Sequence, residues 1–341
     1  MTSAGAPVVG LTVGAPVIDA LGWQMLFVMQ AVLMVVPVAA SWVVLRETPR
    51  REASFDVPGA VVLAAGVGPL LLGVDQAPEW GITSPSVVGC VAAGAVGLVA
   101  FTAVERRAPT PLVPLAFFRH RDVRSSLTSG FLSGASYMGG FFIASLLLVE
   151  QFGYTLTSSV PILAIRPALF ALFSPVGGRV AGVAGSRTGV IAGCASLGLG
   201  MVGLAVGSAA DSLPVVVGVG FIFQGVGYGL LRPALTTALA DAVDDRDLGM
   251  AGAAERLTGQ LGVAFGITVM ATVYGGRVDG FPPAFWIGAV LAGLAVLAAL
   301  PMRRGIGHGP VHVSRDPRDG DEGGAPEAEG AVLARTPDEG L

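Results

Sequence analysis

The sequence predicts an all-α integral membrane protein, a helical bundle of about ten transmembrane helices. The 341 residues are 53% hydrophobic and only 13% charged, with a mean hydropathy of +0.72, whereas soluble domains carry about 25% charged residues. Apolar runs of about 18 or more residues recur along the chain, as membrane-spanning helices require. The runs are continuous rather than alternating, which argues against a transmembrane barrel. This composition excludes a soluble enzyme, a nucleic-acid-binding protein and a disulfide scaffold.

Nine apolar runs mark the expected helices in chain order. More polar segments such as Arg46–Asp56 and Asp75–Ser84 separate them. The runs are Trp23–Leu45, Val57–Val74, Val87–Val104, Leu127–Val149, Ser159–Val176, Val190–Val206, Leu213–Leu235, Met250–Tyr274 and Phe285–Leu300. A Gly-rich stretch, Ala4–Leu21, is interpreted as a tenth helix and not as a signal peptide, because no basic segment precedes it and Asp19 replaces a small-residue cleavage site.

The arginines predict the orientation of these helices. All 20 basic residues are Arg, and alternate connections hold thirteen of them on one side of the membrane against one, Arg277, on the other. Loops rich in basic residues stay in the cytoplasm. We therefore expect a multi-pass protein of the inner (cytoplasmic) membrane whose Arg-rich loops, such as 105–124, face the cytoplasm.

The C-terminal segment differs in composition from the rest of the chain. Residues Gly309–Leu341 hold three Arg and eight acidic residues with almost no large apolar side chain. Such a segment buries too little apolar surface to offset its ordering entropy, so we expect a disordered acidic cytoplasmic tail. Cys90 and Cys194 lie inside apolar runs and are interpreted as buried thiols that pack as small hydrophobic groups.

Fifty glycines suggest close helix packing. Small residues four positions apart let helix backbones approach each other in lipid. The pairs are Gly130/Gly134, Gly189/Gly193, Gly203/Gly207, Gly225/Gly229 and Gly262/Gly266. Two interpretations stay open: tight structural packing, or smooth faces on which transporter helices slide.

One motif near the start of the chain points to a family. Gly10-Leu11-Thr-Val-Gly14-Ala15, followed by Leu-Gly-Trp-Gln24, resembles the fifth-helix antiporter motif of the major facilitator superfamily, in its fourteen-helix drug:proton antiporter branch. The family pattern is Gly-Pro-x-x-Gly-Gly and then Leu-Gly-Trp-Arg. Leu11, Ala15 and Gln24 are therefore departures from it.

Further segments match the same family in order and orientation, so that the resemblance runs from about Gly5 to Arg304. They are Pro78–Pro85, Glu105–Arg107, Pro111–Arg119, Phe152–Thr155 and Gln260–Gly266. In this register the first four helices of the family are missing. The implied domains are 1–46, the last two helices of the N-terminal bundle; 47–123, two inserted linker helices and a cytoplasmic loop; 124–304, a C-terminal six-helix bundle; and 305–341, the tail.

The resemblance implies a secondary active transporter that exports amphiphilic drugs or other small molecules by alternating access, coupled to protons. Its partners would be a small-molecule substrate, protons and the lipid bilayer, with no nucleic acid, cofactor or metal, and the sequence indicates no oligomeric state. No HExxH, GxxxxGK[ST] or GxSxG motif suggests an enzyme. The alternative is a truncated, non-transporting membrane protein, arising as a gene remnant or from a misassigned start, or a membrane scaffold.

Arg166 is the clearest candidate for a functional residue. It lies inside an apolar run and is followed by Pro167, and a charged side chain within the bilayer is costly enough to suggest a function. It would either face the cavity and contact an anionic group or a carboxylate, or be a structural Arg that snorkels or pairs with a carbonyl freed by the proline. Tyr137, Gln224 and Tyr228 are expected to line a drug cavity or to form interhelical hydrogen bonds.

Two further sets of residues lie near the expected cytoplasmic ends of helices. Glu255 is interpreted as a proton-coupling carboxylate, or alternatively as part of a charge network with Arg232, Arg246 or Arg256. The turn that contains Gly178, Arg179, Gly182 and Arg187 resembles the loop motif of the superfamily. Gly182 replaces the acidic residue of that motif, which weakens the implied charge clamp.

Overall fold

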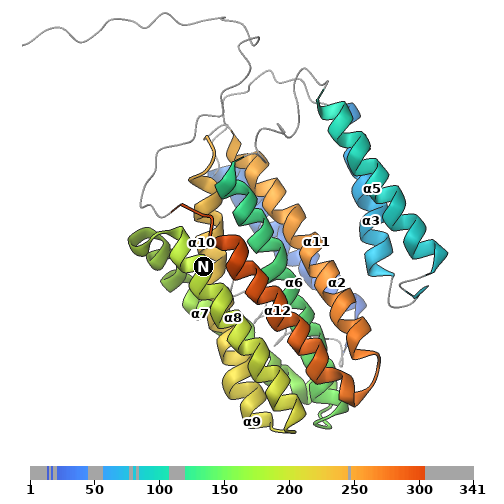
Figure 1. Cartoon of the computed structure of the whole chain (residues 1–341), viewed down its shortest axis with the longest axis vertical. Coiled ribbons are helices and arrows are strands. Elements are labelled where there is room, and N and C mark those ends of the chain that lie inside the picture. The colour runs from blue at the N-terminus through green and yellow to red at the C-terminus, as the bar shows by residue number, and fades with distance from the viewer. Residues whose placement is uncertain are drawn as a thin grey trace, which may run out of the picture.

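A computed structural model of the protein describes residues 14, 17, 21–44, 57–76, 80–81, 84–106, 120–244 and 247–303. All regular secondary structure within these residues is helical (Figure 1). The elements are α2 (Gln24–Val44), α3 (Val57–Asp75), α5 (Pro85–Glu105), α6 (Arg121–Glu150), α7 (Leu156–Ala184), α8 (Ser186–Ala209), α9 (Leu213–Val215), the π-helix η2 (Val216–Phe221), α10 (Ile222–Ala240), α11 (Leu248–Tyr274), the 3₁₀-helix η4 (Val278–Gly280) and α12 (Phe281–Ala299).

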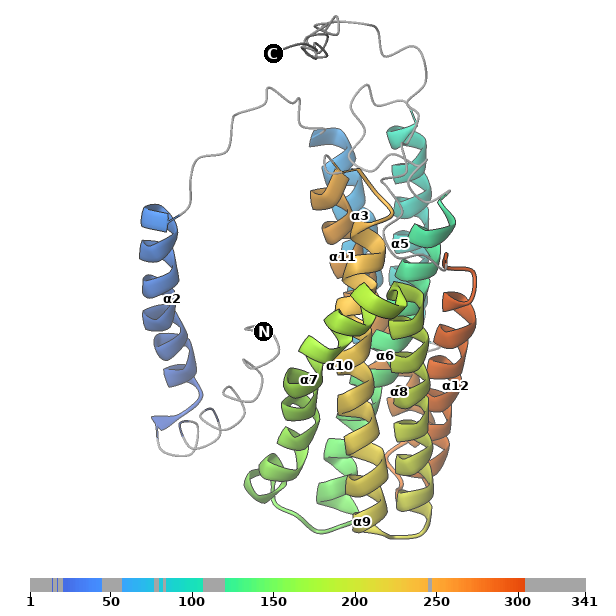
Figure 2. The same cartoon turned by 90° about the vertical axis from the view of Figure 1, so that its left-hand side faces the viewer.

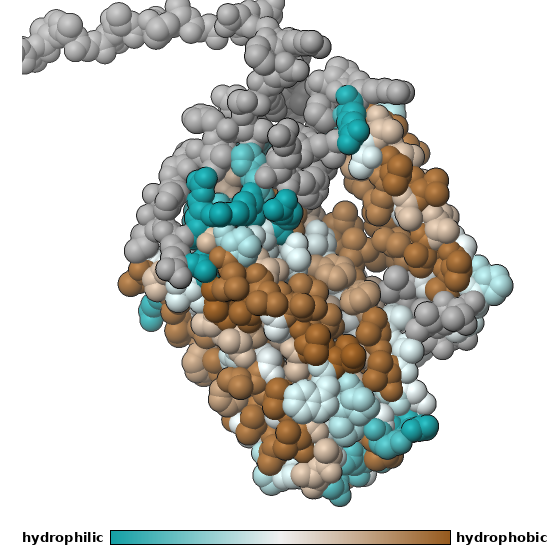
Figure 3. Space-filling model, in the orientation of Figure 1, coloured by the Kyte–Doolittle hydropathy of each residue, from teal (hydrophilic) through white to brown (hydrophobic). Residues whose placement is uncertain are grey.

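The expected multi-pass membrane fold is confirmed. Within the described residues, eight helical segments are long and apolar enough to cross a bilayer, and Val57–Gly73 adds a shorter apolar helix. Apolar side chains cover much of the face of the molecule shown in Figure 3, and hydrophilic residues gather toward its ends. The predicted helix Ala4–Leu21 lies almost entirely outside the described residues, and the predicted tail, 305–341, lies wholly outside them.

Several helices continue beyond the predicted apolar runs, mainly at the end that carries the Arg-rich loops. Helix α6 begins at Arg121, before the predicted Leu127, and α7 ends at Ala184, well past the predicted Val176. Hydropathy marks the lipid-facing part of a helix, whereas backbone hydrogen bonds carry the helix on into the polar interface. The predicted loop between α7 and α8 is therefore wrong in extent: it is reduced to Gly185, whose φ is 84°.

Helices α6 to α12 pack into one bundle (Figures 1 and 2). Helix α6 packs against α11 and α12, α10 packs against α7 and α8, and α8 also contacts α12. The largest core cluster joins these helices through side chains that include Ile143, Leu147, Met201, Phe221 and Phe285. The bundle therefore has a continuous apolar interior across helices that are distant in sequence.

The helices that precede this bundle lie at its outside. Helices α3 and α5 pair with each other, and α3 also contacts α11. Helix α2 stands apart in Figure 2, and none of its apolar window is buried. Cys194 is fully buried and Cys90 is partly buried, and both are free thiols.

Glycines set the spacing between helices. A Cβ atom built on Gly266 would lie 2.1 Å from the carbonyl oxygen of Ala135, and one on Gly262 would lie 2.3 Å from that of Phe131. At the crossing of α7 and α10, a Cβ on Gly225 would lie 2.7 Å from the carbonyl oxygen of Arg166. These distances are too short for any side chain. The predicted packing role is therefore confirmed at these glycines, whereas Gly130 and Gly134 are less closely packed, at 3.8 and 3.5 Å.

We predict that Gly266→Ala lowers the free energy of unfolding by about 1 to 3 kcal/mol, the usual cost of overpacking a tight contact. The added methyl group has to displace a backbone carbonyl of α6, which cannot rotate away as a side chain can. Gly259→Ala is the matched control on the same helix, because a Cβ there meets no atom within 4 Å. Thermal unfolding of the purified protein in detergent measures both variants, and equal midpoints would contradict the packing role.

Candidate functional site

Arg166 lies inside the six-helix bundle and is completely buried, with 0% of its surface exposed. It lies ten residues after Leu156, the start of α7, which is about 15 Å along the helix. Its Nη2 donates a hydrogen bond of 2.7 Å to the backbone carbonyl of Tyr137 on α6. A carbonyl is therefore its partner, as one interpretation of the sequence expected. This carbonyl comes from a neighbouring helix and not from the residue freed by Pro167.

Aromatic rings surround the guanidinium group. Its Cζ lies 4.4 Å from the ring centroid of Tyr137, 4.8 Å from that of Phe141 and 5.9 Å from that of Phe221. The negative faces of aromatic rings attract a cation, most strongly where water is excluded. The rings from α6 and η2 thus replace part of the hydration that Arg166 loses on burial.

Nε and Nη1 of Arg166 have no hydrogen-bond partner in the described structure, and neither has Oε1 of Gln224 on α10. No described acidic residue forms an ion pair with Arg166. A buried polar atom without a partner costs roughly 1 to 3 kcal/mol, and such atoms in native proteins call for a specific reason. A polar ligand that meets them would supply that reason.

Two of the other predicted cavity residues, Tyr137 and Tyr228, lie beside Arg166. The ring of Tyr137 stacks on that of Tyr228, with centroids 3.8 Å apart and an interplanar angle of 1°. Gln224 is fully buried, and its Nε2 donates a hydrogen bond of 3.3 Å to Sδ of Met201. The structure therefore brings together Tyr137 from α6, Arg166 from α7 and Tyr228 from α10, and Gln224 lies one turn before Tyr228 on α10.

Sequence reasoning missed four neighbours of this group: Phe141, Phe170, Phe221 and Met201. Phe170 meets the edge of Tyr228 at 5.4 Å between centroids. Phe141 follows Tyr137, and Phe170 follows Arg166, by four residues, so each pair shares one helix face. That spacing was available in the sequence. No comparable pattern in the sequence predicts the π-helix that ends at Phe221.

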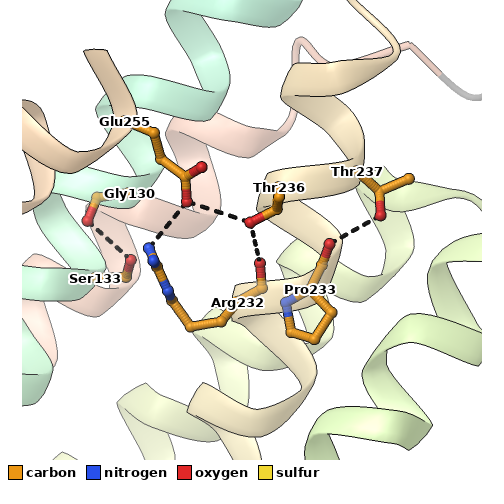
Figure 4. A network of polar contacts seen from close by, with 7 residues as sticks. All are labelled: Gly130, Ser133, Arg232, Pro233, Thr236, Thr237 and Glu255. Carbon is orange, nitrogen blue, oxygen red and sulfur yellow. Dashed lines mark hydrogen bonds and ion pairs between the residues drawn. The ribbon is translucent and has the colours of Figure 1, made fainter. Parts of the chain in front are cut away.

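Glu255 lies in a separate network at the Arg-rich end of the bundle (Figure 4). Its Oε1 lies 3.1 Å from Nη1 of Arg232 and accepts a hydrogen bond of 3.3 Å from Oγ1 of Thr236. The expected charge network with Arg232 is thus confirmed. Arg256 is exposed, and Arg246 lies outside the described residues. Arg232 follows Tyr228 by four residues, about one turn of α10, so the Glu255 pair lies next to the Tyr228 end of the group, while Arg166 itself forms no ion pair with Glu255.

The described motif residues belong to other parts of the chain than the Arg166 group. Gly10 and Ala15 lie outside the described residues, and Gly14 is helical, with its ideal Cβ 3.9 Å from Cδ2 of Leu26. The predicted loop-motif residues Gly178, Arg179 and Gly182 belong to α7, because that helix runs to Ala184. Gly178 and Gly182 face open space, and Arg179 is exposed. Arg187 lies in the first turn of α8.

Comparison with known proteins shows relatives along most of the chain. A sequence model of the Major Facilitator Superfamily matches residues 1–223 and 162–336. The lincomycin resistance protein of Streptomyces lincolnensis is 31% identical over 313 residues, which are 87% of this chain and 63% of that protein. The multidrug resistance protein Stp of Mycobacterium tuberculosis is 30% identical over 274 residues, 77% of this chain and 49% of that protein.

A third relative is the tetracenomycin C resistance and export protein of Streptomyces glaucescens. It is 26% identical over 284 residues, 83% of this chain and 53% of that protein. The chain thus spans between about half and just under two thirds of the length of these relatives. The matches agree with the family that the order of motifs in the sequence indicates.

We predict a measurable but modest coupling between Arg232 and Glu255, whose side chains are 36% and 14% exposed. A double-mutant cycle of Arg232→Ala and Glu255→Ala should give about 1 kcal/mol in the free energy of unfolding, because partial exposure screens the pair. Unfolding in sodium dodecyl sulfate measures it. The control cycle, Arg256→Ala with Glu255→Ala, should be additive, and an equal coupling in both cycles would refute the specific pair.

Proposed function

Because the chain belongs to the Major Facilitator Superfamily, we propose that it acts as a secondary active transporter that exports amphiphilic small molecules by alternating access. The observation that carries this proposal is the group of buried Arg166, Tyr137 and Gln224 with the partly buried Tyr228, which come from three helices of one bundle. Drug-binding cavities are largely apolar and aromatic, with a few polar groups that orient the ligand. The printed names of the relatives, which are resistance and export proteins, support the same assignment.

The coupling ion in this proposal is the proton, and Glu255 is the carboxylate to test. It lies on α11 and is mostly buried. It forms an ion pair with Arg232 and accepts a hydrogen bond from Thr236, both of α10. Protonation of Glu255 would remove the charge that attracts Arg232 and would so weaken the contact between the two helices. A proton taken up here would thereby favour a different packing of α10 against α11.

We also propose that the protein lies in the inner (cytoplasmic) membrane, with its Arg-rich loops and its C-terminal tail in the cytoplasm. The distribution of arginines supports this orientation. At the opposite end of the bundle Tyr274 donates a hydrogen bond to Glu150, Gln151 donates one to the carbonyl of Ser208, and Arg277 pairs with Asp279.

The second candidate function is a membrane protein or scaffold that does not transport. One observation favours it: the apolar window of α2 is 0% buried, so no residue of that window is buried against the other described helices. Transport needs a cavity enclosed between helices on both sides. An efflux measurement on the chain distinguishes the two functions.

We predict the topology from the arginine distribution. Reporter fusions at the Arg-rich end should report the cytoplasm, and those at the other end the outside, because basic loops are retained on the cytoplasmic side. The cytoplasmic positions are Arg51, His120, Arg187 and Leu341, and the external ones are Glu79 and Asp211. A cytoplasmic signal at Glu79 would overturn the orientation.

We predict that the chain, expressed in a drug-sensitive host, lowers the accumulation of amphiphilic dyes or antibiotics, and that Arg166→Ala reduces efflux per molecule by about tenfold, or about 1.4 kcal/mol. Arg166→Lys should restore only part of it, because an ammonium group keeps the charge but loses the planar set of donors. Immunoblotting of membranes normalises for abundance, and Arg256→Ala, which removes an exposed charge, is the control.

Two results would contradict this prediction. Accumulation equal to that of the empty host at normal abundance would favour the non-transporting alternative. Loss of abundance in Arg166→Ala, with efflux per molecule intact, would make Arg166 a structural residue.

A further inference from the structure

We propose that Arg166 selects the charge of the substrate, so that this site takes anionic, ring-bearing molecules, such as aromatic carboxylates and phenolates, in preference to cationic ones. The inference rests on the proposed transport function and adds to it the chemical class of the substrate. Four features of the described structure carry it: the free donors of Arg166, the balance of charge, the aromatic surroundings and the π-helix beside them.

The first feature is the unused hydrogen-bonding capacity of the guanidinium group. A guanidinium only donates hydrogen bonds. Nη2 uses one on the carbonyl of Tyr137, while Nε and Nη1 have no partner in the described structure. Those donors need an acceptor, and a carboxylate or phenolate oxygen gives the strongest bond because its charge is opposite. A cationic ligand offers no such acceptor charge.

The second feature is the balance of charge inside the bundle. Among the described charged residues only Arg166 and Glu105 are buried, and Glu105 is the last residue of α5, outside this bundle. Glu255 lies farther along and is paired with Arg232. The interior around Arg166 therefore has a net positive charge in a medium that screens poorly, which attracts an anion and repels a cation.

The third feature is the shape of the surroundings. Tyr137 and Phe141 present their rings to Arg166, and Tyr228 stacks flat on Tyr137. This stacking shows that the space between α6 and α10 accommodates planar rings in contact. Sδ of Met201 lies beside Gln224, and a flexible thioether adapts to ligands of different outline. A planar substrate with one negative group fits both the rings and the charge.

The fourth feature explains how a completely buried site can open. Phe221, which lies against Arg166, is the last residue of the π-helix Val216–Phe221. A π-helical turn is rare and occurs mostly at functional sites. Its hydrogen bonds can shift to the ordinary α-helical register, which rotates the residues of the turn about the helix axis. Such a local change would turn Phe221 away from the guanidinium. Gln224 lies three residues farther along, on the same helix face.

The test measures the binding of two dyes of similar size and ring system but opposite charge. Fluorescein carries a carboxylate and a phenolate, and tetramethylrhodamine methyl ester is a cation. The full chain is purified in detergent, and binding is followed by fluorescence anisotropy for the wild type, Arg166→Ala, Arg166→Lys and the exposed-charge control Arg256→Ala. Size-exclusion chromatography confirms that each variant is folded.

We expect the wild type and Arg256→Ala to bind fluorescein more tightly than the cationic dye. Arg166→Ala should weaken fluorescein binding by about tenfold or more while leaving the cation within about twofold. Arg166→Lys should keep part of the preference for the anion. If Arg166→Ala does not fold, the comparison of the wild type with Arg166→Lys decides.

The proposal is overturned if the wild type prefers the cation or binds neither dye, if Arg166→Ala weakens both dyes equally, or if it changes neither. Because binding is measured without a membrane gradient, these outcomes are independent of efflux. A chain that binds fluorescein through Arg166 but shows no efflux would refute the proposed transport function and leave the charge selection standing.

Discussion

Helices in a bilayer gain little from the hydrophobic effect when they meet, because lipid chains are as apolar as leucine. Close approach of backbones must therefore supply the contact energy, and every other feature of this bundle depends on that constraint. At Gly262 and Gly266 the backbone of α11 touches carbonyl groups of α6, and at Gly225 and Gly229 α10 touches α7 in the same way. These contacts fix the helices closely enough to exclude lipid and water from the space around Arg166.

The exclusion of lipid and water raises the free-energy cost of burying the Arg166 charge and also strengthens the interactions that this charge can make. An isolated cation in a medium of low polarity loses its hydration, and this bundle replaces it with one carbonyl bond and three ring contacts. The replacement is incomplete, since two guanidinium nitrogens have no partner in the described structure. A purely structural arginine would be better satisfied. The unpaired donors destabilise the empty site, and a ligand that accepts their hydrogen bonds removes that cost. This difference between the empty and the occupied site is the energetic condition for selective binding.

The sequence predicted the parts of this structure that follow from local chemistry. Hydropathy placed the helices, and the cost of a charge in lipid singled out Arg166 together with its polar neighbours Tyr137, Gln224 and Tyr228. Helix ends such as Ala184 were missed, because helical hydrogen bonding continues where hydropathy stops. Phe221 and Met201 were missed because their contact with the site depends on how distant helices cross and on a π-helical turn, neither of which a residue pattern encodes.

The glycine contacts and the side-chain contacts together determine which parts of the bundle can separate. Helices α7 and α10 meet backbone to backbone at Gly225, Gly229 and Gly177, so separating them would expose close-packed surfaces over several turns. The described hydrogen bond between α7 and α6 comes from Arg166, and the Tyr137–Tyr228 stack joins α6 to α10 through side chains. Side-chain contacts can exchange for contacts with a ligand, whereas backbone contacts cannot. An anion bound by the free donors of Arg166 would therefore act on the side-chain contacts that join α6 to α7 and α10, and not on the backbone contacts that hold α7 and α10 together.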